Sequence, residues 1–175
     1  MSQHGALENL VVLDLTRVLA GPFCTMMLAD MGAKVIKIEM PVSGDDTRAY
    51  PPFRTNCNGE RESLYFANIN RNKQGITLNL KAQEGKEIFK KLVETADIVV
   101  ENYRPGVMDK LGLGYDVLKE INPRIIYGSV SGFGNTGPYR LRPGYDILGQ
   151  AMGGLMAITG SKGGEPTRAG SAMGD

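Results

Sequence analysis

Polar and basic side chains follow three segments of the sequence that are apolar enough to be buried strands. Arg17 comes directly after the first apolar run, Lys81 follows another, and Asn102–Arg104 follows a third. If these strands are parallel neighbours, their carboxyl ends meet at one edge of a sheet, where ligands usually bind. Backbone amides, an amide side chain and scattered cations suit a phosphorylated, nucleotide-like ligand. Each cation taken alone is more simply explained as a solvated surface charge.

The elements that must position this edge begin with residues 10–39. Leu10–Thr16 is rich in β-branched residues, as a buried strand is. Ala20–Gly32 has apolar residues at helical spacing and ends on a glycine suited to a C-cap, and Ala33–Glu39 is a second strand. A strand–helix–strand unit of this length predicts a parallel, right-handed crossover.

A dinucleotide site is the first alternative for this unit. Glu39 ends the second strand, about where a ribose-binding carboxylate is expected. The turn between the first strand and the helix argues against a dinucleotide site. Only Gly21 stands there, whereas three spaced glycines are needed for the backbone to approach a pyrophosphate closely. Glu39 is otherwise interpreted as a solvated strand end.

The remaining pattern predicts an α/β fold, a Rossmann-like doubly wound and mostly parallel sheet. After a polar, turn-rich excursion over residues 41–61, residues 64–70 lead into a basic turn at Asn70–Gly75. The expected elements are strands at 76–80, 97–101 and 124–130, and helices at 82–96, 104–111, 115–121 and from Tyr145. The stretch from Gly128 to Gly174 is rich in glycine, which suits tight turns or backbone held close to a ligand.

Composition excludes several function classes. The 175 residues carry a formal net charge of +1, which gives no electrostatic case for nucleic acid or membrane surfaces. Cys24 and Cys57 are too few for a disulfide framework, so a cytoplasmic location is the default expectation. The only histidine, His4, excludes histidine triads and multi-histidine metal sites within this segment, and we expect no metal or redox cofactor.

An ordered set of motifs resembles the opening of the class III CoA-transferases, the formyl-CoA transferase and carnitine CoA-transferase family. The resemblance runs collinearly over nearly the whole chain and ends on Gly174-Asp175, which is similar to the family's catalytic Gly-Asp. The other matching segments are Asp14–Pro22, Gly32–Glu39, Gly44–Arg48, Asn70–Lys73, Glu101–Gly106, Leu111–Gly114, Ile121–Arg124, Gly132–Gly134, Gly137-Pro138 and Gly144–Asp146.

The resemblance implies that CoA moves from an acyl-CoA donor to a free carboxylic acid. Asp175 would be the nucleophile, forming a mixed anhydride and then an aspartyl-CoA thioester. The flanking glycines would let backbone amides approach a developing oxyanion. By position, the resemblance places the CoA contacts at Val18, Leu19, Met40, Leu78, Asn79, Leu80, Lys81, Asn102, Tyr103, Arg104, Lys110, Arg142 and Tyr145. Among these, Lys81, Arg104, Lys110 and Arg142 would pair with phosphates, and Asn70–Lys73 is a secondary candidate.

Three positions depart from related sequences. Met40 stands where many relatives have an arginine, and Leu19 where some have a glutamine facing the acyl site, so we assume no formyl or oxalyl substrate. The related α-methylacyl-CoA racemases have a histidine in a Gly-His-Asp motif, whereas this chain has Tyr145 in Gly144–Asp146. Because tyrosine is a poor base at neutral pH, a transferase is favoured over a racemase.

The family fold implies an interlocked homodimer, in which residues 1–175 would be the N-terminal part of the CoA-binding Rossmann-like large domain. A segment ending at the catalytic aspartate would be inactive alone. A non-catalytic CoA-binding or assembly segment is the alternative from another class, and a dinucleotide-binding module is the third. The donor and acceptor acids are not specified by these residues.

Overall fold

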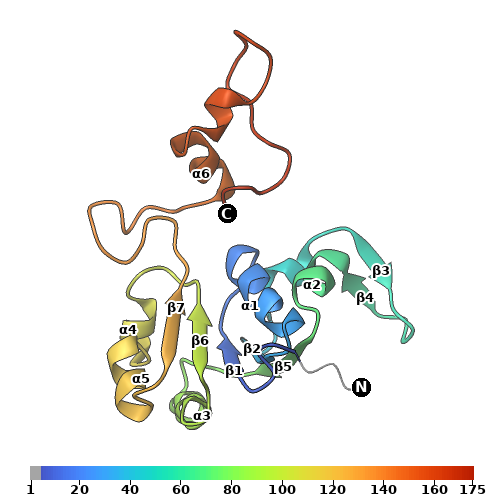
Figure 1. Ribbon diagram of the computed structural model, residues 1–175. Coiled ribbons are helices and arrows are strands. Elements are labelled where there is room, and N and C mark those ends of the chain that lie inside the picture. The colour runs from blue at the N-terminus through green and yellow to red at the C-terminus, as the bar shows by residue number, and fades with distance from the viewer. Residues whose placement is uncertain (1–4) are drawn as a thin grey trace. The chain divides into compact units, whose positions relative to one another are not determined.

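The computed structural model describes residues 5–175, so His4 lies outside the described residues. Two compact units make up the chain, the first extending to Val130 and the second comprising Ser131–Asp175. The first unit contains a sheet with its covering helices, and the second is mostly loop around one α-helix and one 3-10 turn (Figure 1). Across residues 5–175, no helix is long and apolar enough to cross a membrane.

Five parallel strands form the sheet of the first unit, as predicted. They are β1 (Val11–Asp14), β2 (Lys34–Glu39), β5 (Lys73–Thr77), β6 (Ile98–Glu101) and β7 (Ile126–Ser129), in the order β5-β2-β1-β6-β7. Numbered within the sheet, this is the 3-2-1-4-5 order of Rossmann-like folds, in which the strand order reverses beside the first strand.

Helices cover both faces of the sheet, and strand alternation sorts the apolar side chains between two cores. α1 (Ala20–Asp30) packs on one face, where its Ala29 meets Val12 and Val35. The other face is covered by α3 (Gln83–Val93), α4 (Val107–Leu111) and α5 (Tyr115–Ile121), and Leu13 and Phe89 are fully buried there. The fold is therefore doubly wound, with α1 on one face of the sheet and α3, α4 and α5 on the other (Figure 1).

Residues 41–69 contain more regular structure than the turn-rich surface excursion expected over residues 41–61. They contain a 3-10 turn, η1 (Asp46–Ala49), an antiparallel hairpin of β3 (Phe53–Thr55) and β4 (Arg61–Ser63), and α2 (Leu64–Ile69). Ser63 caps α2 by accepting a hydrogen bond from Phe66 N. β5 begins at Lys73 rather than Ile76, so the predicted basic turn is partly strand.

The second unit is built around α6 (Asp146–Met152) and the 3-10 turn η2 (Leu155–Ile158). Gly132 and Gly144 lie back to back at its start, and a Cβ added to Gly132 would lie 2.3 Å from the Gly144 Cα. No side chain fits between these two backbones, which explains why both motifs carry glycine here.

Candidate active site

Arg17 and Asn102 meet at the point where the strand order reverses. Arg17 follows β1 and Asn102 follows the adjacent β6. The Arg17 N–H donates to Asn102 Oδ1 at 2.9 Å, and Asn102 Nδ2 donates to the Arg17 carbonyl at 2.7 Å. The two loops are therefore joined by a reciprocal pair of hydrogen bonds, 85 residues apart in sequence. The crevice beside such a reversal is where ligands bind in open α/β sheets.

Val18 has an unfavourable backbone conformation in the loop after β1. Its φ is +71°, a region that β-branched residues rarely adopt, so surrounding contacts must hold it. The Val18 N–H donates to Asp45 Oδ1 at 3.3 Å, and its neighbour Arg17 is held by Asn102. The loop at Val18 and Leu19 is thus fixed from two sides.

A buried ion pair lies beneath that loop. Lys37 Nζ donates to Asp45 Oδ2 at 2.9 Å and to the Thr16 carbonyl at 2.8 Å. Asp45 Oδ1 also accepts from the backbone and hydroxyl of Thr47. Burial works against ionisation of Asp45, but the Lys37 charge and these hydrogen bonds outweigh it and lower the pKa of the Asp45 carboxyl. The Asp45 carboxyl therefore stays ionised, and Lys37 links β2 to the Asp45 loop and to the segment after β1.

Glu39 is neither a ribose ligand nor a solvated strand end. Both its oxygens accept from Arg48, Oε2 from Nε at 2.8 Å and Oε1 from Nη2 at 2.7 Å, and Oε2 also accepts from Asp45 N at 2.8 Å. Gly44, with φ +63°, passes so close that an added Cβ would lie 2.8 Å from Glu39 Oε2. The Gly44–Arg48 motif is therefore the loop that closes over the end of β2.

Lys73 fastens the start of α1 to the sheet, which gives the Asn70–Lys73 motif a structural role. Its Nζ donates to Asp14 Oδ2 at 3.0 Å, to the Pro22 carbonyl at 2.9 Å and to Asn70 Oδ1 at 2.9 Å. Thr25 Oγ1 also donates to Asp14, at 2.7 Å. Burial lowers the pKa of the Lys73 amine, and the Asp14 carboxylate opposes that shift.

The residues expected to contact CoA in the first unit follow the carboxyl ends of four neighbouring strands, with one addition in α4. Val18 and Leu19 follow β1, Met40 follows β2, Leu78–Lys81 follow β5, Asn102–Arg104 follow β6, and Lys110 lies in α4. Lys81, Arg104 and Lys110 are exposed, whereas the Leu80 side chain is part of the core. Burial chiefly raises the pKa of the Tyr103 phenol, which therefore stays protonated.

The other expected site residues lie in the second unit. The Arg142 guanidinium stacks 4.1 Å above the centre of the Tyr139 ring. Tyr145 is the N-cap residue of α6, and 67% of it is exposed. Asp175 follows Gly174, whose backbone packs against α6.

Asp146 and Gln150, one turn apart on α6, hold residues 168–174 against that helix. Asp146 Oδ1 accepts from Gly174 N at 2.9 Å, and Gln150 Nε2 donates to both Asp146 oxygens at 2.9 Å. The Gln150 hydrogen bond, the Gly174 N–H and the Arg168 guanidinium lower the pKa of the Asp146 carboxyl. Because its N–H is already engaged, Gly174 does not supply the oxyanion donor expected from this flanking glycine.

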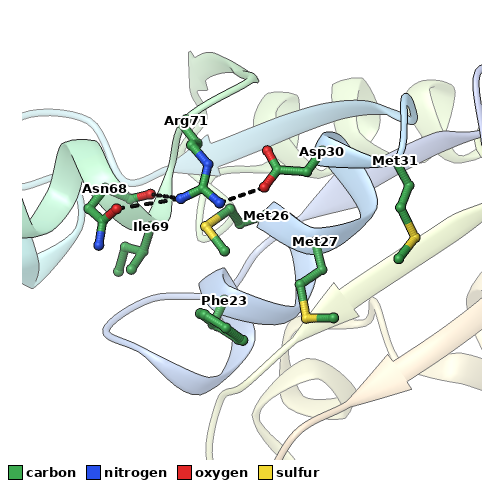
Figure 2. A pocket seen from close by; sticks show the side chains of 8 residues that line it. All are labelled: Phe23, Met26, Met27, Asp30, Met31, Asn68, Ile69 and Arg71. Carbon is green, nitrogen blue, oxygen red and sulfur yellow. Dashed lines mark hydrogen bonds and ion pairs between the residues drawn. The ribbon is translucent and has the colours of Figure 1, made fainter. Parts of the chain in front are cut away.

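A separate hollow of about 370 Å³ lies beside α1 and is lined mainly by apolar side chains (Figure 2). Phe23, Met27 and Met31 are about half exposed there, and Arg71 pairs with Asp30 at 2.6 Å. Arg71, from the secondary candidate Asn70–Lys73, lines this hollow, whereas none of the residues expected to contact CoA does.

The parallel sheet with its polar loops at the strand-order reversal defines a Rossmann-like α/β protein. Over residues 7–175, the chain matches the family described as CoA-transferase family III. The chain belongs to that family.

Named relatives and a solved structure agree with this assignment. The chain is 52% identical to succinyl-CoA:glutarate CoA-transferase of Mus musculus, with 97% of this chain and 38% of that protein aligned. It is 52% identical to acetyl-CoA:oxalate CoA-transferase of Acetobacter aceti, over 95% of this chain and 41% of that protein. A CAIB/BAIF family protein from Brucella suis superposes with a TM-score of 0.92 at 48% identity, over 97% of this chain and 45% of that one. The chain therefore spans about two fifths of the length of the curated relatives.

Proposed function

We propose that the protein moves CoA from an acyl-CoA donor to a free carboxylic acid, with Asp175 as the nucleophile. The observation that carries the proposal is the family match, which extends through Gly174-Asp175. The polar loops at the carboxyl ends of β1 and β6 support it, because they provide amides and cations where this sheet topology binds ligands.

CoA binds, in this proposal, across the strand ends of the first unit. Lys81, Arg104 and Lys110 are exposed there and pair with its phosphates, since charge-assisted hydrogen bonds to phosphate are stronger than neutral ones. By the family resemblance, Arg142 and Tyr145 are also proposed to contact CoA. Met40 leaves one position of this edge without a cation.

The chemistry at Asp175 proceeds by two acyl transfers in each direction. The carboxylate attacks the donor thioester carbonyl, a C–O bond forms, the C–S bond breaks and CoA leaves as a thiolate. The thiolate then attacks the aspartyl carbonyl of the anhydride, which forms the aspartyl-CoA thioester and releases the donor acid. The acceptor carboxylate repeats these steps in reverse and regenerates Asp175. The carboxylate is a suitable nucleophile because its anhydride is reactive enough for the thiolate to capture.

The acceptor is proposed to be a short dicarboxylic acid. The mouse relative is named for succinyl-CoA and glutarate, and the Acetobacter relative for acetyl-CoA and oxalate. Leu19 stands where some relatives have a glutamine facing the acyl site, so selection among such acids is proposed to rest on other contacts.

The active form is proposed to be an interlocked homodimer, and residues 1–175 to contribute part of its CoA-binding large domain. A polypeptide of these 175 residues alone is expected to show no transferase turnover, because it spans only about two fifths of its relatives' length. CoA binding by that polypeptide without thioester exchange would fit the non-catalytic alternative.

Covalent capture tests the proposal directly. The full-length protein is incubated with succinyl-CoA, quenched with borohydride or hydroxylamine, and digested for mass spectrometry. Modification at Asp175, absent from an Asp175→Ala variant, is the expected result. No modification with any acyl-CoA of a small panel would overturn the assignment. Deuterium incorporation from D2O at the acyl α-carbon without CoA exchange would instead indicate a racemase.

A further inference from the structure

Two side chains of α6, Asp146 and Gln150, form hydrogen bonds with the backbone of the segment that leads to the proposed nucleophile, Asp175. We infer that Asp146 and Gln150 are positioning residues, which fix residues 168–174 so that Asp175 is presented in one place. This inference rests on the proposed role of Asp175. Neither side chain is expected to touch the substrate, since both are buried.

The hydrogen bonds connect α6 to four points along the segment. Asp146 Oδ1 accepts from Gly174 N at 2.9 Å, immediately before the nucleophile. Gln150 Oε1 accepts from Ala169 N at 2.9 Å, and Gln150 Nε2 donates to the Ser171 carbonyl at 3.2 Å. Arg168 donates from Nε to Asp146 Oδ2 at 3.2 Å. Three of the four contacts are to backbone atoms of the segment, and only the Arg168 contact uses a side chain of the segment. The backbone contacts hold the course of the segment whatever its side chains are.

Charge balance allows this carboxylate to lie close to the nucleophile in sequence. An uncompensated Asp146 charge would oppose ionisation of a nearby carboxylate. Arg168 Nη2 lies 3.1 Å from Asp146 Oδ2 and supplies the opposite charge. The carboxylate thereby acts as a strong hydrogen-bond acceptor for Gly174 N while its charge is locally compensated.

These hydrogen bonds should affect the reaction rate as well as folding, because the rate depends on where the reacting atoms are held. Reacting atoms must lie within about 3–3.5 Å of each other, and a misplacement of about 1 Å is estimated to cost about 10²-fold in rate. Loss of the Gly174 hydrogen bond frees the residue next to the nucleophile. We therefore expect the loss to appear in kcat, with the KM for acyl-CoA little changed.

Asp146→Asn in the full-length protein is the primary test. The amide oxygen can still accept from Gly174 N, but the amide nitrogen then opposes the donors of Gln150 and Arg168. We expect kcat and the single-turnover rate of borohydride-trapped Asp175 to fall by about 10²-fold, with KM within about threefold of wild type. Adding Gln150→Glu reverses the polarity of the pair, so that the new amide can donate to the new carboxylate while an acceptor for Ala169 N is kept, and the double variant should recover at least about tenfold of the rate.

Matched controls separate positioning from stability and from the proposed function. Asp116→Asn changes an exposed acid in the first turn of α5 and should leave kcat unchanged. Gln150→Met keeps the side-chain length, removes the backbone contacts and should also lower kcat, which preserves the test if Asp146→Asn does not fold. Normal trapping rates in folded Asp146→Asn and Gln150→Met would overturn the inference while the function stands. Absence of an Asp175 adduct in wild type would instead remove the proposed function.

Discussion

Lys37 Nζ lies 2.9 Å from Asp45 Oδ2, and the two side chains are only 2% and 1% exposed. This ion pair joins β2 to the loop whose Asp45 also accepts the Val18 N–H. Val18 has a positive φ and lies in the proposed CoA-binding loop. The energy that holds this unfavourable backbone conformation therefore comes in part from a buried charge pair that does not itself face the ligand.

Lys37→Met should strongly destabilise the protein. The variant leaves Asp45 buried without its cation, and removal of one partner of a buried ion pair typically costs about 3–5 kcal/mol. The free energy of unfolding from urea denaturation measures the effect, and CoA affinity should fall with it because Val18 loses support. Lys34→Met, on the same strand but exposed, is the matched control and should stay within about 0.5 kcal/mol of wild type. A loss below about 1 kcal/mol for Lys37→Met would contradict the role of the pair.

Asn102→Ala should weaken acyl-CoA binding more than it weakens the fold. It removes both hydrogen bonds that join the β1 and β6 loops at the strand-order reversal. Two such bonds at an exposed site are worth about 1–2 kcal/mol, which corresponds to a rise of about tenfold in KM or Kd. Isothermal titration with CoA measures the change. Asn58→Ala, in the turn between β3 and β4, is the control, and equal affinities for both variants would place the CoA site elsewhere.

The pH dependence of stability should report the Glu39–Arg48 pair. Burial alone would raise the pKa of Glu39, but the Arg48 hydrogen bonds, the Asp45 N–H and the nearby cations outweigh it, and the folded-state pKa is lowered. A lowered carboxyl pKa contributes stability that is complete above the unfolded-state value and is lost as pH falls through the folded-state value. Wild type should therefore exceed Glu39→Gln by a constant amount at pH 6–7, about 1 kcal/mol because solvent screens the half-exposed Arg48.

The stability difference between wild type and Glu39→Gln should also change at acid pH. As pH falls below the ordinary glutamate value of 4.5, the difference between wild type and Glu39→Gln should shrink toward zero. Denaturation series at matched ionic strength between neutral and acid pH measure it. A difference that grows on acidification would mean that Glu39 has a raised folded-state pKa and that the Arg48 contacts do not stabilise the charged form.

The sheet was predictable because its strands carry apolar runs between helical patterns. Val12 and Leu13 face opposite cores, as alternation through a doubly covered sheet requires. The start of β5 was predicted three residues late because Lys73 looks like a turn residue. The Lys73 amine is buried against the Asp14 carboxylate. Only this contact between residues distant in sequence allows a buried lysine to be the first residue of the strand.

The location of a candidate residue could be predicted where it depends on one strand and the loop after it, but not where it depends on contacts across the chain. Asn102 is polar and follows an apolar strand, so the sequence placed it at the carboxyl edge of the sheet, where it lies. The pairing of Lys37 with Asp45 gave one weak signal, a lysine between the apolar residues Ile36 and Ile38 of β2. The support that Asp146 gives to Gly174 had none, because the two are 28 residues apart and the segment between them lacks a strong periodic pattern.

Gly149→Ala isolates the close approach between α6 and the segment before the nucleophile. Alanine favours a helix interior by about 1 kcal/mol over glycine, so propensity alone predicts a more stable protein. The added Cβ, however, would lie 2.5 Å from the Gly174 carbonyl oxygen, and that backbone must shift. We expect trapping of the Asp175 adduct to slow by at least about tenfold, by the same positional sensitivity that governs near-attack geometry. Gly170→Ala, where an added Cβ meets nothing within 4 Å, is the matched control and should label at the wild-type rate. Equal labelling by both variants would show that the contact with Gly149 does not determine where Asp175 is held.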